Sequence, residues 1–71
     1  MANFARLHDD MLEYEMQLVR VMENLEEARR QMVTRRDTGV MAKAADLARE
    51  LRGVAEEYGD WLRETADKSG E

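Results

Sequence analysis

The chain has 71 residues, 44% of them apolar and 38% charged, and its 16 acidic and 11 basic residues give a formal net charge of -5. It contains no cysteine, which excludes disulfides, thiolate metal sites and cysteine nucleophiles. It also lacks the long apolar run of a membrane-spanning helix and the apolar core of a secretory signal, so we expect a cytoplasmic protein without a membrane partner.

The first predicted element is a helix over about residues 3–36. Its apolar residues alternate at spacings of three and four, which is the pattern of heptad positions a and d. This first seam comprises Phe4, Leu7, Met11, Tyr14, Leu18, Val21, Leu25, Ala28 and Met32. Asn3 is a suitable N-cap, because its side-chain oxygen can accept a hydrogen bond from a free amide of the first turn.

A turn is predicted at residues 37–39, because the polar Arg35 occupies the next d position and ends the seam. We expect Gly39 to adopt a positive φ at the helix end, and Asp37 or Thr38 to cap the next helix. The alternative is one long helix with a one-residue skip, since Val33 and Val40 are also seven residues apart.

The second predicted helix covers about residues 39–67 and precedes a frayed tail at 68–71. Its seam comprises Val40, Ala44, Leu47, Leu51, Val54, Tyr58, Trp61 and Thr65, and a parallel lane comprises Met41, Ala48, Ala55 and Leu62. The alanines allow close approach of another helix. Gly53 and Gly59 each cost about 1 kcal/mol within a helix, so each marks a close helix contact or a weak point.

These elements predict an all-α fold, in which residues 1–71 form one antiparallel two-helix hairpin. Residues whose numbers sum to about 75 then lie level with each other, which places Tyr14 opposite Trp61 and Met32 opposite Ala44. Phe4 and Leu7 fall opposite the polar tail and lack an apolar partner within the chain.

Small size and charge placement both favour a homodimer. Chains below roughly 70–80 residues rarely stabilise a core without a staple or a second subunit. Basic residues gather near the turn and acidic residues near the free ends, an arrangement that suits the helix dipoles and also antiparallel pairing of two hairpins. We therefore predict an antiparallel four-helix bundle. Its predicted core and dimer interface comprise Phe4, Leu7, Met11, Tyr14, Leu18, Val21, Leu25, Met32, Val40, Met41, Leu47, Leu51, Val54, Tyr58, Trp61 and Leu62.

A second apolar stripe on the first helix has no place in this core. Leu12, Met16 and Val19 follow the i, i+4, i+7 spacing of one helix face, and His8 extends it. The stripe is either a docking site for another protein, which adaptable methionines favour, or surface that is scattered or used in self-association.

The sequence gives little support for catalysis or for a cofactor. His8 is the single histidine, no Glu-x-x-His motif accompanies it, and the inward positions of both helices are apolar. We expect no metal, no cofactor and no catalytic residue.

The main functional prediction is a non-enzymatic module that binds a partner protein. It would be a small dimeric adaptor, a chaperone-like subunit or an inhibitor, including the type that phages make against host factors. One alternative is a nucleic-acid-binding regulator whose basic turn contacts phosphates through Arg29, Arg30, Arg35, Arg36 and Lys43. The net negative charge makes nucleic acid the weaker hypothesis. The other alternative is a structural coiled-coil segment.

Overall fold

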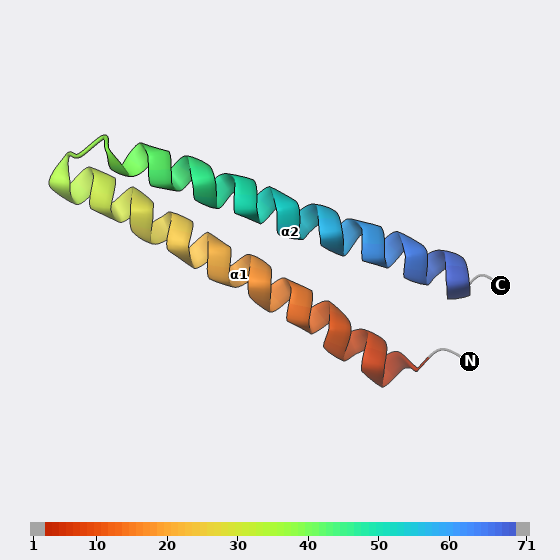
Figure 1. Ribbon diagram of the computed structural model, residues 1–71. Coiled ribbons are helices and arrows are strands. Elements are labelled where there is room, and N and C mark those ends of the chain that lie inside the picture. The colour runs from red at the N-terminus through yellow and green to blue at the C-terminus, as the bar shows by residue number, and fades with distance from the viewer. Residues whose placement is uncertain (1–2, 70–71) are drawn as a thin grey trace.

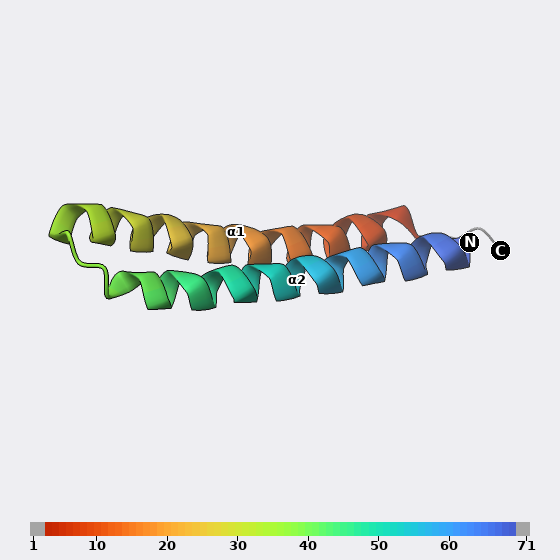
Figure 2. The ribbon, with the colours of Figure 1, turned by 90° about the horizontal axis from the view of Figure 1, so that it is seen from above.

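The computed structural model describes residues 3–69, which form two helices, α1 (Phe4–Arg35) and α2 (Val40–Ser69). The helices run antiparallel beside each other, so both chain ends lie at the same end of the molecule (Figures 1 and 2). This confirms the all-helical hairpin and contradicts the alternative of one continuous helix.

The start of α1 follows the sequence prediction. Asn3 has an extended backbone, and its side-chain oxygen accepts a hydrogen bond from the amide of Arg6 at 3.2 Å. Its carbonyl oxygen accepts from the amide of Leu7 at 3.0 Å. Asn3 is therefore the N-cap, and it satisfies an amide of the first turn that has no partner within the helix.

The turn is built differently from the prediction. Arg36, with φ of 51° and ψ of 40°, is the left-handed residue that ends α1, whereas Gly39 does not have a positive φ. The amide of Gly39 instead donates to Asp37 Oδ1 at 2.8 Å, and a Cβ at Gly39 would lie 3.0 Å from that oxygen. Glycine is thus suited to this position because the Asp37 side chain approaches closely.

The C-terminal half of α2 also differs from the prediction. The helix continues through Lys68 to Ser69, past the expected end near residue 67, and residues 70–71 lie outside the described range. The cation of Lys68 in the last turn favours this extension through the helix dipole.

Within the hairpin, a Cβ added at Gly53 or Gly59 would meet open space, so neither glycine marks a close contact between α1 and α2.

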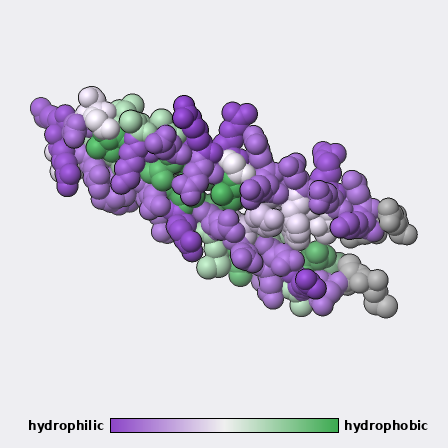
Figure 3. Space-filling view, viewed as in Figure 1, coloured by the Kyte–Doolittle hydropathy of each residue, from purple (hydrophilic) through white to green (hydrophobic). Residues whose placement is uncertain are grey.

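The hairpin is a single thin layer, with Cα extents of 54 × 18 × 10 Å. Among residues 3–69, Val21 and Ala28 are the only buried apolar side chains, with exposed fractions of 4% and 3%. The other residues of the two seams are half-buried, except that Phe4 is 80% exposed. In the view of Figure 3, hydrophilic side chains cover most of the surface and hydrophobic ones follow the line between the helices. Two helices alone cannot enclose a core.

Candidate interaction surfaces

An aromatic cluster joins the two helices in the half of the hairpin near the chain ends. The rings of Tyr14 and Tyr58 stack with centroids 5.0 Å apart, and Tyr14 and Trp61 lie 5.6 Å apart. Tyr58 and Trp61 complete the cluster at 6.3 Å. The predicted pairing of Tyr14 with Trp61 is confirmed, and offset aromatic stacking stabilises the helix contact there.

A hydrogen bond between the helices lies beside this cluster. The hydroxyl of Tyr58 donates to the carboxylate of Glu15 at 3.0 Å. Desolvation, this hydrogen bond and the negative charge of Glu15 raise the pKa of Tyr58 above its ordinary value of 10.0. The contact therefore favours the neutral form of the phenol at alkaline pH.

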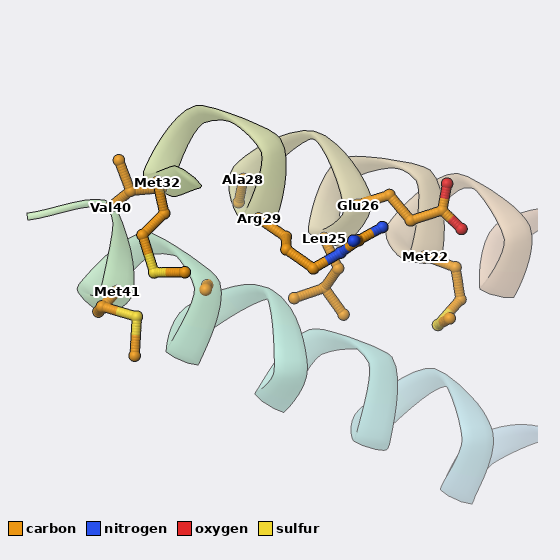
Figure 4. Close-up of a pocket in the computed structure, with 9 residues that line it drawn as sticks. Met22, Leu25, Glu26, Ala28, Arg29, Met32, Val40 and Met41 are labelled. Carbon is orange, nitrogen blue, oxygen red and sulfur yellow. The ribbon is translucent and has the colours of Figure 1, made fainter. Parts of the chain in front are cut away.

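An apolar groove of about 380 Å³ lies between the helices near the turn, and we call it the turn-end groove (Figure 4). It is lined by Met22, Leu25, Glu26, Ala28, Arg29, Met32, Val40, Met41 and Ala44. The groove exists because the small side chains of Ala28 and Ala44 leave space between larger neighbours. Glu26 and Arg29 are the charged groups in its lining.

Two lining residues show which face of the hairpin carries the groove. Met22 and Arg29 are seven residues apart at heptad position e, which borders position a of the first seam. Met41 belongs to the lane of α2, whose other members recur every seven residues on the same side of that helix. We call this broad side the apolar face, after Met22 and the apolar lane of α2. The other e positions of the first helix on this side are polar or charged, namely His8, Glu15, Arg29 and Arg36.

The opposite broad side is polar. A second groove there is lined by Asp10, Glu13, Tyr14, Gln17, Glu57 and Trp61. Asp10 and Gln17 occupy heptad position g, which lies across the seam from position e. We call this side the polar face, and the contrast between the two faces is the main asymmetry of the hairpin.

Side chains on the apolar face are exposed to solvent in the isolated hairpin. The exposed fractions are 44% for Met22, 55% for Met41 and 38% for Leu62. Met41 and Leu62 were predicted as interface residues and Arg29 as a phosphate contact, whereas Met22 was assigned no role. The position of Met22 next to the first seam was the signal that could have identified it.

The stripe of Leu12, Met16 and Val19 lies on the outer side of α1, and we call it the outer stripe. These side chains are 45%, 57% and 54% exposed. They line a shallow groove of about 350 Å³ together with Glu15, Arg20 and Glu23. Since heptad positions b and f face away from the first seam, the outer stripe is separate from the contact with α2.

His8 does not add an apolar contact to this stripe. Its side chain is 75% exposed, and Nδ1 lies 3.3 Å from a carboxylate oxygen of the equally exposed Asp9. Within the described part of the chain, no three histidine, aspartate or glutamate side chains group in a way that could hold a metal ion. No helix among residues 3–69 is long and apolar enough to cross a membrane.

The basic turn is solvent-exposed in the hairpin. Arg30 forms ion pairs with Glu26 and Glu27 at 3.4 and 3.1 Å on its own helix. The other predicted basic residues, Arg29, Arg35, Arg36 and Lys43, are exposed as well. None of these four takes part in an ion pair within residues 3–69.

Comparison with models of known protein families, with curated proteins and with solved structures finds no match to this chain.

Proposed function

We propose that this protein is a homodimeric, non-enzymatic module that binds a partner protein. Two hairpins form an antiparallel four-helix bundle through their apolar faces, and the outer stripes of the bundle carry the partner site. The observation that supports this most strongly is the thinness of the hairpin, in which Val21 and Ala28 are the only buried apolar side chains among residues 3–69. A second layer would complete the core.

Either broad side of the hairpin is large enough for a stable interface. The broad side of the hairpin measures 54 by 18 Å. Stable protein interfaces typically bury about 800 Å² on each partner, which a face of these dimensions can supply. Exposed Met22, Met41 and Leu62 would then become part of the bundle interior.

Charge placement supports the antiparallel orientation. Arg35, Arg36 and Lys43 lie at or near the turn, while Asp9, Asp10 and Glu64 lie near the chain ends. Turns at opposite ends of the dimer place each basic turn beside the acidic ends of the other copy. Turns at the same end would bring the arginines of both copies together.

The outer stripe supports the assignment of a partner-protein site. It lies on the outer side of α1, so the contact with α2 leaves it exposed. Its methionine can adapt to varied surfaces, and Arg20 and Glu23 place one basic and one acidic side chain at the edge of its groove. An adaptor, a chaperone-like subunit or an inhibitor such as those made by phages would use such a surface.

The double variant Leu12→Glu with Met16→Glu tests the partner site. We expect it to stay helical and dimeric but to lose the protein that the wild type captures. Asn24→Glu with Thr34→Glu adds the same charge outside the stripe and should retain that protein. Dissociation of the Leu12→Glu, Met16→Glu dimer would instead assign the stripe to self-association.

The basic turn supports a second candidate function, binding of nucleic acid. Arg29, Arg35, Arg36 and Lys43 are exposed and could each contact a phosphate. The net charge of -5 opposes this function, because the acidic ends repel the same ligand. Titration of labelled DNA and RNA at several salt concentrations distinguishes the two functions. Salt-sensitive binding that Arg35→Glu abolishes would support the second.

A further inference from the structure

We propose that a second copy of the chain fills the turn-end groove with the N-terminal half of its α1, in a register that brings the two Met22 side chains together. This inference rests on the proposed dimer and adds its register. It identifies the occupant of the groove as Met11 and Leu18 of the other copy.

Symmetry limits how two flat hairpins can stack. When the apolar faces meet and the turns lie at opposite ends, the two-fold axis runs across both helices. Each α1 then lies over α1 of the other copy, and each α2 lies over α2. The apolar side of each helix must therefore pack against a copy of itself that runs in the opposite direction.

The a positions of α1 are spaced by seven residues and can meet this requirement at several registers, so Met22, the only apolar residue at an e position of the first helix, sets the register. When residues whose numbers sum to about 44 come level, Met11 meets Met32, Leu18 meets Leu25, and Met22 meets its own copy. Met32, Leu25 and Met22 all line the turn-end groove. The groove of each copy is therefore filled by apolar side chains of the other.

Charge complementarity supports the same register. It places Glu15, an e residue, level with Arg29, an e residue on the edge of the groove. Arg29 takes part in no ion pair within residues 3–69. The two-fold axis produces the Glu15–Arg29 pair twice in each dimer.

The second helix gives independent support. Residues of α1 and α2 lie level when their numbers sum to about 75. The α1 pairs, which sum to about 43 or 44, therefore fix the α2 pairs at sums of about 106 or 107. Ala48 then meets Gly59, and Ala45 meets Leu62. A Cβ at Gly59 meets nothing within the hairpin, so this glycine leaves space for the small side chain of Ala48 in the other copy.

Single-cysteine variants test the register, because the natural chain has no cysteine. Under mild oxidation, Met22→Cys should form a disulfide-linked dimer in high yield. Asn24→Cys is the matched control, since it lies within one turn of residue 22 but at position g on the polar face. Phe4→Cys is the control for orientation. Both controls should stay largely unlinked.

The alternative outcomes separate the register from the dimer itself. Sedimentation of the reduced variants measures whether each one is dimeric. Dimers in which Phe4→Cys links to itself would overturn the register in favour of turns at the same end. Dimers in which Asn24→Cys links and Met22→Cys does not would overturn the choice of face. Monomers of the wild type would overturn the proposed dimer together with its register.

Discussion

The hydroxyl of Tyr58 on α2 donates a 3.0 Å hydrogen bond to the carboxylate of Glu15 on α1. Within residues 3–69 it is the only hydrogen bond between the two helices, and apolar and aromatic contacts provide the rest of their association. The pKa of Tyr58 is raised above 10.0, mainly because the phenol is desolvated. The hydrogen bond to Glu15 and the negative charge of that carboxylate raise it further.

This relationship predicts how the protein responds to alkaline pH. Because the folded-state pKa of Tyr58 is raised, its contribution to stability is present below pH 10.0 and is lost as the pH rises through the higher value. In a Tyr14→Phe background, tyrosinate absorbance should titrate above pH 10.0, and Glu15→Gln should lower that midpoint. An unchanged midpoint in Glu15→Gln would show that Glu15 does not affect the phenol.

The small core predicts a sharp difference between two valines of the same helix. Val21 is 4% exposed and Val19 is 54% exposed. We expect Val21→Ala to lower the free energy of unfolding by about 2 kcal/mol through lost apolar burial, and Val19→Ala to change it by less than about 0.5 kcal/mol. Denaturant titration followed by circular dichroism measures both. Equal losses would contradict the assignment of the first seam.

The left-handed residue at the end of α1 predicts a stabilising substitution. Arg36 has φ of 51°, a conformation that costs a residue with a side chain about 1–2 kcal/mol relative to a right-handed one. Arg36→Gly and Arg36→Ala remove the same charge. The difference between their free energies of unfolding therefore reports the effect of the backbone conformation. We expect the glycine variant to be more stable by about 1 kcal/mol. A more stable alanine variant would contradict the observed turn.

The proposed pairing of Glu15 with Arg29 predicts a rescue. Arg29→Glu should raise the Kd of dimerisation roughly tenfold, because two ion pairs of about 0.2–1 kcal/mol each are replaced by repulsion. In ultracentrifugation, the double variant Arg29→Glu with Glu15→Arg should bind itself more tightly than the single variant Glu15→Arg, which loses the hydrogen bond from Tyr58 in the same way. The two positions are separated by about 21 Å along one helix, so rescue cannot arise within one chain.

The same substitution at the two glycines of α2 should affect the dimer differently. Gly53→Leu and Gly59→Leu each raise helix propensity by about 0.8 kcal/mol, and both positions are exposed in the hairpin. Only Gly59 meets Ala48 of the second copy in the proposed register. We expect Gly59→Leu to weaken dimerisation roughly tenfold through overpacking, while Gly53→Leu leaves the Kd unchanged. Similar Kd values for both would argue against the α2 contact.

The fold could be predicted from the sequence because both seams keep a regular spacing of three and four residues. The break at Arg35 was predictable because a charged residue interrupts that spacing, and the cap at Asn3 because it depends on local side-chain chemistry. The conformation of the turn was not predictable, because either Arg36 or Gly39 could have changed the chain direction. The choice depends on where α1 ends and on the contact between Asp37 and the backbone of Gly39.

The candidate surfaces were only partly predictable. The outer stripe follows from the spacing of Leu12, Met16 and Val19 within one helix. The turn-end groove does not, because it forms where Met22 and Arg29 of α1 lie on the same broad side as Met41 of α2. That relation depends on the rotation of each helix about its axis, which the sequence pattern of a single helix leaves open.

Sedimentation equilibrium of the wild-type chain at micromolar concentration tests the central claim most directly. A homodimer predicts a mass of twice the 8.3 kDa of one chain, with cooperative unfolding whose midpoint rises with protein concentration. A folded species of 8.3 kDa, with a midpoint that is independent of concentration, would contradict the account.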